Sequence, residues 1–152
     1  MTCLVVPAVK HEEVYRVYYE DVDYAGIVYY ANYFKFIERA RTEMLRDRGI
    51  THTNLRNLLN VGFVVKKVSA DFIAPLKFDD LVKVQSEITR LTQVRVEINQ
   101  IILSRHVKLF EADVTIACTD SNGHLVKIPN VIHERLKVHP FKTDERVSTL
   151  PI

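Results

Sequence analysis

The residues best suited to chemistry lie together in the stretch EDVDYAGIVYYANY, residues 20–33. Its carboxylates are Glu20, Asp21 and Asp23, and a glycine and a short apolar run follow them. A carboxylate in an apolar setting can attack a carbonyl or activate water as a general base. The backbone N–H groups at the start of a helix have no partner within the helix and can hold an oxyanion. The two groups side by side would suit acyl transfer.

A structural reading of the same residues is also available. An aspartate just before a helix is more often a cap, which accepts a hydrogen bond from the first helical turn, than a catalytic group. Asp21 and Asp23 are two residues apart and would project to the same side if strand geometry continued through them. Gly26 allows a tight turn or a close approach of the backbone. Spacing alone leaves both readings open.

The segments on either side of this stretch predict the elements that position it. Residues 12–20 are rich in valine and tyrosine and predict a first strand. From Asn32 to Arg48 apolar residues recur with a helical period, which predicts one long helix that ends at Gly49. Residues 51–60 predict a short second helix.

The rest of the chain reads as strands joined by short turns. Alternating patterns predict strands over residues 61–75, 81–91, 93–103 and 108–118, a turn at 120–123, a short last strand at 124–128 and a terminal helix at 129–138. Short turns require antiparallel neighbours, and the long helix must bury its apolar stripe against the sheet. The predicted fold class is therefore α+β, with an antiparallel sheet of about five strands wrapped around one long helix.

Composition limits the possible partners. The chain has 152 residues, 47% of them hydrophobic and 26% charged, which fits one soluble domain. The formal net charge of +2 gives no reason to expect binding to nucleic acid. We expect no signal peptide and no integral membrane segment, because no apolar run approaches the roughly 18 residues needed to span a bilayer. Cys3 and Cys118 predict no disulfide and a reducing, cytoplasmic location. Apolar residues left on the outer face of the sheet predict a homo-oligomer.

The common motifs for metals, cofactors and other hydrolases are missing. No serine stands in a G-x-S-x-G elbow, and no glycine-rich nucleotide motif occurs, so we expect no cofactor. The histidines show no metal-ligand spacing and are predicted to lie on the surface or in turns, with no metal bound; they are His11, His52, His106, His124, His133 and His139.

Residues 17–49, VYYEDVDYAGIVYYANYFKFIERARTEMLRDRG, resemble the hotdog-fold acyl-CoA thioesterases of the 4-hydroxybenzoyl-CoA thioesterase family. They are most similar to the branch associated with the Tol-Pal cell-envelope system. The resemblance continues through residues 63–91 and 111–123. It implies a thioesterase domain over residues 13–137, between a flexible N-terminal segment, residues 1–12, and a C-terminal tail, residues 138–152.

The resemblance also implies roles for single residues. Asp23 matches the catalytic acid, the backbone N–H of Tyr30 matches the group that polarises the thioester carbonyl, and Asp21 matches a supporting residue. Tyr30 stands where the Tol-Pal branch usually has histidine. This difference leaves the identity of the substrate open. It does not change the expected reaction, because the hydrogen-bond donor is the backbone N–H and not the side chain. The residues of this stretch expected to bind the substrate are Gly26, Ile27, Val28 and Tyr29, and the last three would line the acyl end. Whether Asp23 acts as nucleophile or as general base stays open.

The substrate and partners follow from the same resemblance. The substrate would be an acyl-CoA, with Lys66 and Arg90 as candidates to attract the coenzyme A phosphates, although the LTQV tip beside Arg90 is not basic. The alternative for Lys66 is a solvated residue on an edge strand, where lysine discourages aggregation. Alternation would place Lys66 and Lys67 on opposite faces of their strand. The family builds its sites across dimers and often pairs dimers into tetramers. The alternative function is a binding or scaffolding module for acyl carrier protein or envelope-lipid enzymes. A dehydratase is disfavoured because the acidic stretch has no histidine.

Overall fold

The computed structural model describes residues 10–137. The elements in chain order are β1 (His11–Arg16), η1 (Tyr19–Asp21), η2 (Tyr30–Asn32), α1 (Tyr33–Asp47), α2 (His52–Leu59), β2 (Val61–Phe72), β3 (Leu81–Leu91), β4 (Arg95–Ser104), β5 (Val107–Asp120) and α3 (Asn130–Lys137). The two η elements are single turns of 3-10 helix that flank a loop.

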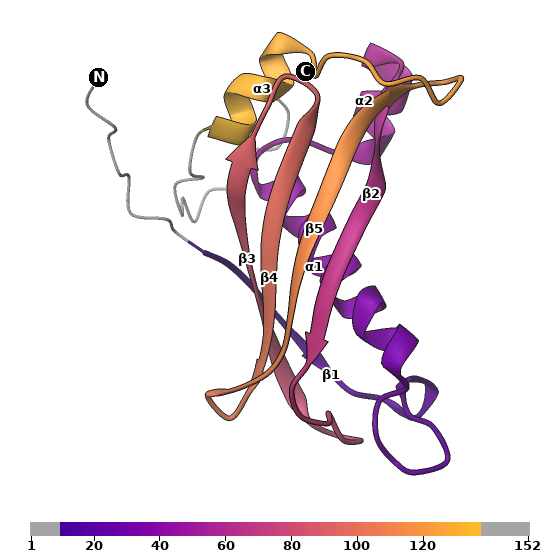
Figure 1. Ribbon diagram of the computed structural model, residues 1–152, viewed down its shortest axis with the longest axis vertical. Helices are drawn as coiled ribbons and strands as arrows, with labels where there is room; N and C mark the ends of the chain where they lie inside the picture. Colours follow the sequence, from indigo (N-terminus) through magenta and orange to yellow (C-terminus); the bar gives the residue numbers. More distant parts are fainter. Residues whose placement is uncertain (1–9, 138–152) are drawn as a thin grey trace, which may run out of the picture.

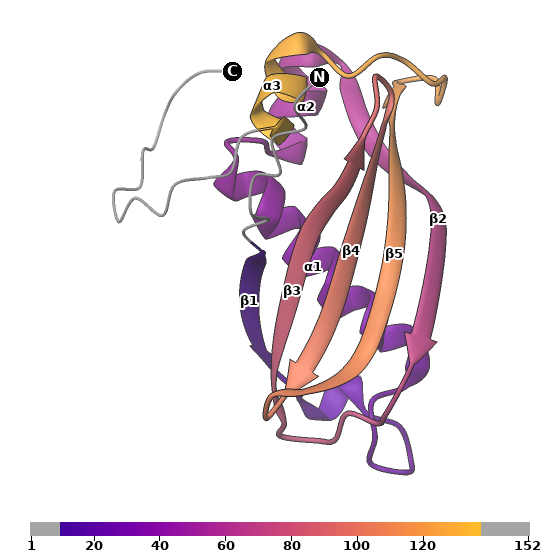
Figure 2. The same ribbon diagram turned by 60° about the vertical axis from the view of Figure 1, so that its left-hand side comes forward.

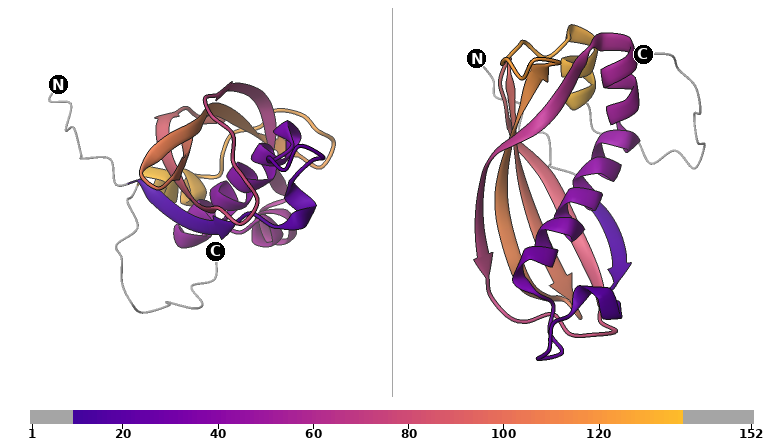
Figure 3. Two further views of the ribbon diagram at one scale, coloured as in Figure 1. Left: turned by 90° about the horizontal axis from the view of Figure 1, so that it is seen from below. Right: turned by 90° about the vertical axis from the view of Figure 1, so that its right-hand side faces the viewer.

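One antiparallel sheet of five strands, in the order β1-β3-β4-β5-β2, forms the body of the molecule (Figure 1). Helix α1 runs along one face of this sheet (Figure 2). Seen along the strands, the sheet curls around the helix (Figure 3). The predicted α+β hotdog arrangement, with the sheet wrapped around one long helix, is therefore confirmed.

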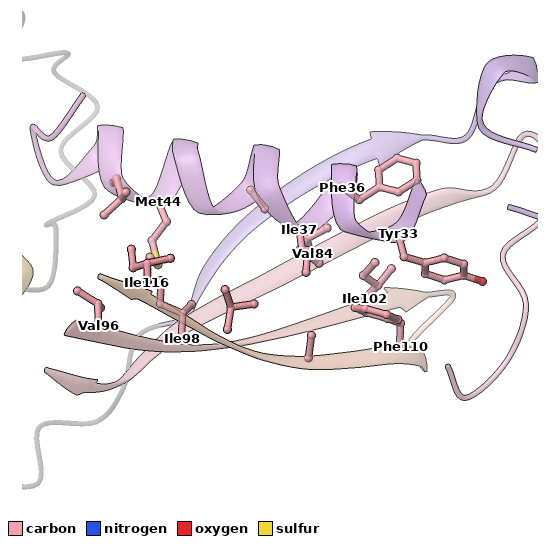
Figure 4. Close-up of a cluster of buried hydrophobic side chains, with 14 of the residues drawn as sticks. Tyr33, Phe36, Ile37, Met44, Val84, Val96, Ile98, Ile102, Phe110 and Ile116 are labelled. Carbon is pink, nitrogen blue, oxygen red and sulfur yellow. The ribbon is translucent and has the colours of Figure 1, made fainter. Parts of the chain in front are cut away.

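The core lies between α1 and the sheet (Figure 4). The helix buries the stripe predicted for it and one further aromatic residue: Tyr33, Phe36, Ile37, Ala40, Met44 and Leu45. The sheet contributes buried residues that include Val84, Val96, Ile98, Ile102, Phe110 and Ile116. Burying one such large side chain contributes about 1.5–3 kcal/mol. The helix stops where Gly49 adopts a φ of +74°, a left-handed conformation that suits glycine.

The first strand is shorter than predicted. It ends at Arg16, and the chain turns into the 3-10 helix η1. The turn is stabilised locally, because the Tyr18 N–H donates to the Asp21 carboxylate over 2.8 Å. At its other end β1 begins at His11, inside the segment predicted to be flexible. The other residues assigned to the terminal segments, 1–9 and 138–152, lie outside the described part of the chain.

The short strand predicted over residues 124–128 does not form. Only an isolated bridge joins Leu125 to Thr119. β4 pairs with β5 only as far as Ala117, so residues 118–120 are left to bond with residues 124–126. The Asp120 N–H donates to the His124 carbonyl and the Val126 N–H to the Cys118 carbonyl, a contact too short to form a strand. The chain instead crosses the end of the sheet, where the Ile128 N–H donates to the Gln93 carbonyl over 2.8 Å. Pro129 then precedes α3, as predicted.

Two further observations concern the apolarity of the helices and the state of the cysteines. Within residues 10–137, no helix combines the length and apolarity that crossing a bilayer requires. Cys118 is a buried free thiol, and burial raises its pKa. Cys3 lies outside the described residues.

Candidate active site

Residues 20–30, named here the acidic turn, form a loop at the end of the molecule where β1 leaves the sheet (Figure 1). The Asp23 N–H donates to the Ile27 carbonyl over 2.9 Å, and the Ala25 N–H donates to Asp23 Oδ1 over 2.8 Å. Gly26 closes the turn with a φ of +77°. The Asp23 side chain is exposed at the surface of this turn. The backbone therefore fixes one carboxylate oxygen and leaves the other facing solvent.

The residues that hold the acidic turn come from a distant part of the sequence. The Val28 N–H donates to the Leu76 carbonyl over 2.8 Å, and Ile27 forms an isolated bridge with Lys77. Beside them the Asp79 N–H donates to the Val17 carbonyl over 3.0 Å. The loop that joins β2 to β3 thus clamps the turn from one side.

Asp21 does not share the environment of Asp23. Its side chain is buried, with the residue only 4% exposed. Its carbonyl accepts hydrogen bonds from the Tyr29 N–H over 3.0 Å and from the Asn32 side-chain amide over 2.9 Å. Strand geometry ends at Arg16, so the condition under which both aspartates would project to one side is not met. Asp21 instead supports the turn, as the resemblance implied.

The start of the long helix carries free donors. The 3-10 turn at Tyr30 leads directly into α1, and neither Tyr29 nor Asn32 caps it with a side-chain hydrogen bond. Among residues 10–137, no acceptor is paired with the Tyr30 N–H. The Asn32 side chain makes no capping bond with its oxygen and donates its N–H to the Asp21 carbonyl. A free N–H at a helix start can polarise a carbonyl oxygen.

The residues predicted to line the acyl end divide into two groups. Tyr29 is exposed and Ile27 half-buried, so both can contact a ligand beside the turn. Val28 is only 3% exposed and belongs to the core, so it supports the turn from below. Phe72, which the sequence reading did not select, is 47% exposed and packs edge-on against Tyr30 with ring centroids 6.3 Å apart. Its only sequence signal is an aromatic residue at the end of a strand.

A groove of about 500 Å³ lies between α1 and β2, and we call it the α1/β2 groove. Its lining is Phe34, Lys35, Ile37, Glu38, Arg39, Arg41, Val65, Val68 and Val114. Phe34 is four residues after Tyr30, so the groove begins one helical turn beyond the acidic turn. Its lining combines apolar residues of both elements with charged residues of α1.

A buried polar chain reaches this groove from the sheet. The Gln100 side chain, fully buried, donates to the Ile37 carbonyl and to Ser86 Oγ, each over 2.8 Å. Its carbonyl oxygen accepts a hydrogen bond from Arg41 over 2.9 Å. Burial lowers the pKa of Arg41, and the nearby Glu38 opposes that shift. The sequence signal for these contacts is a serine and a glutamine at inward-facing strand positions.

The predicted phosphate-binding residues do not join Asp23 within one chain. Lys66 is exposed in a β-bulge of β2, which interrupts the alternation expected to separate it from Lys67. Arg90 lies near the β3–β4 turn, at the opposite end of the sheet (Figure 1), and pairs with Glu97 over 3.7 Å. Any role for them in binding coenzyme A stays a prediction.

The prediction that all histidines lie on the surface or in turns is wrong for His11. The His11 side chain is only 9% exposed, and its Nε2 lies 2.9 Å from an Asp47 oxygen and 3.4 Å from a Glu13 oxygen. Burial raises the pKa of Glu13, and His11 opposes this shift. These three side chains could hold a metal ion, but they lie at the end of α1 away from the acidic turn. The expected absence of a metal stays a prediction.

The sequence and structure of this chain are similar to those of a known protein family. Residues 17–136 match the family model described as the thioesterase-like superfamily. The chain is 42% identical over 108 residues to the acyl-CoA thioester hydrolase YbgC of Shigella flexneri, covering 69% of this chain and 78% of that protein. It is 39% identical over 105 residues to the acyl-CoA thioesterase YbgC of Haemophilus influenzae, covering 69% and 77%.

A solved structure agrees with these sequence matches. A probable thioesterase from Bartonella henselae superposes with a TM-score of 0.77 at 35% identity, over 80% of this chain and 100% of that one. The family match spans most of the chain and includes both the acidic turn and the helix start. The chain therefore belongs to the thioesterase-like superfamily.

Proposed function

We propose that this chain hydrolyses acyl-CoA thioesters to a free acid and coenzyme A. The observation that carries the proposal is that one loop presents the exposed Asp23 carboxylate and ends at the Tyr30 N–H, for which residues 10–137 offer no acceptor. The relatives at 42% and 39% identity, which are named as acyl-CoA thioester hydrolases, support the same reaction class.

In the proposed reaction, the Tyr30 N–H donates to the thioester oxygen and stabilises the negative charge that develops on it. The Asp23 carboxylate then acts by one of two routes. As a general base it takes a proton from water, and the hydroxide adds to the carbonyl carbon. As a nucleophile it forms an acyl anhydride, which water then hydrolyses. In both routes the C–S bond breaks, and the thiolate of coenzyme A leaves and takes up a proton.

The test of the assignment is the Asp23→Asn variant. Asparagine keeps an oxygen that can accept the Ala25 N–H, so the turn is preserved while the base or nucleophile is lost. We expect kcat/KM for acyl-CoA esters to fall by about 10²–10⁴-fold. The control is Asp113→Asn, an exposed aspartate on β5. Turnover like that of the wild type in a folded Asp23→Asn protein would rule out the proposed role.

The substrate preference can be measured with the same assay. Exposed aromatic rings beside the helix start, those of Tyr29, Tyr30 and Phe72, offer a surface for the acyl group. We propose coenzyme A as the carrier and acyl carrier protein as the alternative. Steady-state kinetics with benzoyl, short-chain and long-chain esters of each carrier would rank both the acyl group and the carrier.

We also propose that the chain acts as a homo-oligomer in the cytoplasm. The exposed valines of β2 support self-association, and the buried free thiol of Cys118 suits a reducing compartment. Light scattering on the purified protein and fractionation of producing cells test these two statements separately.

A further inference from the structure

Tyr33, the first residue of α1, has a hydroxyl that takes no direct part in the proposed reaction. The residue is only 4% exposed. Its ring stacks on Phe110 with centroids 5.1 Å apart and meets Phe72 edge-on at 5.2 Å. Figure 4 shows the hydroxyl at the outer end of the ring, directed away from the other labelled residues. Because the ring is packed on two sides, its hydroxyl oxygen is held in one place.

This oxygen binds the clamp on the acidic turn. The Leu76 N–H donates to the Tyr33 hydroxyl oxygen over 3.2 Å in a buried setting. The Leu76 carbonyl accepts a hydrogen bond from the Val28 N–H over 2.8 Å. Leu76 is fully buried, so water cannot replace a lost partner of its backbone groups. One peptide of the clamp is therefore held at its N–H by α1 and at its carbonyl by the acidic turn.

The two hydrogen bonds close a ring that contains Tyr30. The ring runs from the Tyr33 hydroxyl through Leu76 to the Val28 N–H, and the chain from Val28 to Tyr33 completes it. Tyr30 lies within that stretch of chain, and its N–H is the proposed donor to the thioester oxygen. A closed ring restricts the orientations of the peptide planes inside it. The Tyr33 hydroxyl therefore restricts the direction of the Tyr30 N–H.

Asn32, the residue before Tyr33, closes a second ring. Its side-chain amide donates to the Asp21 carbonyl over 2.9 Å, and the same carbonyl accepts from the Tyr29 N–H over 3.0 Å. Tyr30 lies between Tyr29 and Asn32 and so belongs to this ring as well. Two adjacent side chains at the helix start thus hold opposite sides of the loop, one through the clamp and one through Asp21.

Asp23 is attached to the same clamp. Its N–H donates to the Ile27 carbonyl over 2.9 Å, and Ile27 forms a bridge with Lys77. These two residues adjoin the backbone pair that the first ring joins. A shift of that pair would therefore move the Asp23 carboxylate relative to the Tyr30 N–H.

From these contacts we infer that the Tyr33 hydroxyl and the Asn32 amide are positioning groups for the proposed hydrolysis. They act through the backbone and hold the Asp23 carboxylate and the Tyr30 N–H at a fixed separation. The inference rests on the proposed function and extends it to two side chains that do not take part in the reaction themselves. Misplacing a catalytic group by about 1 Å can lower a rate by about 10²-fold.

The variant Tyr33→Phe tests the inference, because it removes the hydroxyl and keeps the packed ring. We expect kcat for acyl-CoA esters to fall by about 10-fold or more and KM to change by less than about 2-fold, since alignment affects the transition state and not substrate binding. The matched control is Tyr15→Phe. Tyr15 also packs against a ring of α1, that of Phe36 at 6.0 Å, but it lies on β1 and outside both rings of hydrogen bonds. It should keep the wild-type kcat.

Combination with Asp23→Asn separates positioning from a purely structural role. If the Tyr33 hydroxyl acts by aligning the carboxylate, it matters little once the carboxylate is gone. Tyr33→Phe should then lower the residual rate of the Asp23→Asn protein by no more than about 2-fold. A double variant whose loss equals the product of the two single losses overturns the inference.

Thermal unfolding of each variant allows rates to be compared per folded protein. A folded Tyr33→Phe protein with the wild-type kcat overturns the inference, even if it unfolds at a lower temperature. If Tyr33→Phe does not fold, Asn32→Ala, at a half-buried position, decides the question by the same two criteria. An active Asp23→Asn protein refutes the proposed reaction itself. Wild-type rates in Tyr33→Phe beside an inactive Asp23→Asn protein refute only the positioning role.

Discussion

Asp21 and Asp23 show how far environment decides the role of a residue. They are the same residue type, two positions apart, yet one is buried in a backbone network and the other stands at the surface. The sequence predicted that this stretch carries the chemistry, and the resemblance distinguished the two aspartates. Their separate environments could not be derived from spacing, because the 3-10 turn η1 depends on a hydrogen bond from Tyr18.

At the residue scale, Glu111 should make stability depend on pH in the acid range. Lys108 and the Asn99 amide bind its carboxylate and lower its pKa. Since the folded pKa lies below the ordinary value, the stabilisation is present above that value and is lost as pH falls through the folded pKa. Because the group is near the surface, the effect should stay below about 1 kcal/mol.

The variant Glu111→Gln checks this prediction. Urea denaturation at pH values from about 6 down to about 3 should give a shallower loss of stability in the variant than in the wild type. If the free energy of unfolding fell equally with decreasing pH in the two proteins, the assigned role of Glu111 would be contradicted.

At the scale of elements, the acidic turn depends on a backbone conformation that only Gly26 adopts cheaply. A Cβ at this position would meet nothing within 4 Å, so a substitution there has no steric clash to confuse the result. Gly26→Ala should therefore cost about 1–2 kcal/mol through the positive φ alone. Activity should fall with it, because the same turn presents Asp23.

Gly62 supplies the matched control. Its Cβ would also meet nothing within 4 Å, but its φ is not in the left-handed range. Gly62→Ala, in strand β2, should be neutral or slightly stabilising. Equal losses of stability in the two variants, measured by thermal unfolding, would show that the turn conformation is not the cause.

The elements that the sequence predicted well are those with a long periodic pattern. Helix α1 and strands β3, β4 and β5 fall within a few residues of their predicted bounds because burial on one face enforces the pattern. The strand predicted over residues 124–128 did not form because β4 occupies that side of β5 as far as Ala117, which leaves only residues 118–120 as partners, and local alternation does not encode this. The Gln100 contacts with Arg41 and Ser86 were missed for a similar reason, since they join three elements distant in sequence.

At the scale of the whole molecule, helix α3 contributes buried packing at a distance from the proposed active site. Helix α3 packs at the end opposite the acidic turn (Figure 1), where Arg135 donates to the Gly49 carbonyl over 2.7 Å. Ile132 of α3 is fully buried. Ile132→Ala should lower the free energy of unfolding by about 2–5 kcal/mol and leave KM unchanged in the protein that remains folded.

Val131 provides the comparison for this variant. It is the neighbouring residue on α3 but is 40% exposed, so Val131→Ala should change stability by no more than about 0.5 kcal/mol. Guanidinium denaturation and steady-state kinetics on both variants test the separation. A large rise in KM for Ile132→Ala would show that the two ends of the molecule are coupled.

The clamp on the acidic turn has a consequence for biosynthesis. The turn is completed by backbone groups of Leu76, Lys77 and Asp79, which follow it in the chain only after α1, α2 and β2. A ribosome makes the chain from its N-terminus at roughly 5–20 residues per second. The residues of the turn therefore leave the ribosome seconds before the segment that completes the turn. A nascent chain that stops before residue 76 contains Asp23 but lacks the backbone partners that fix the conformation of the acidic turn.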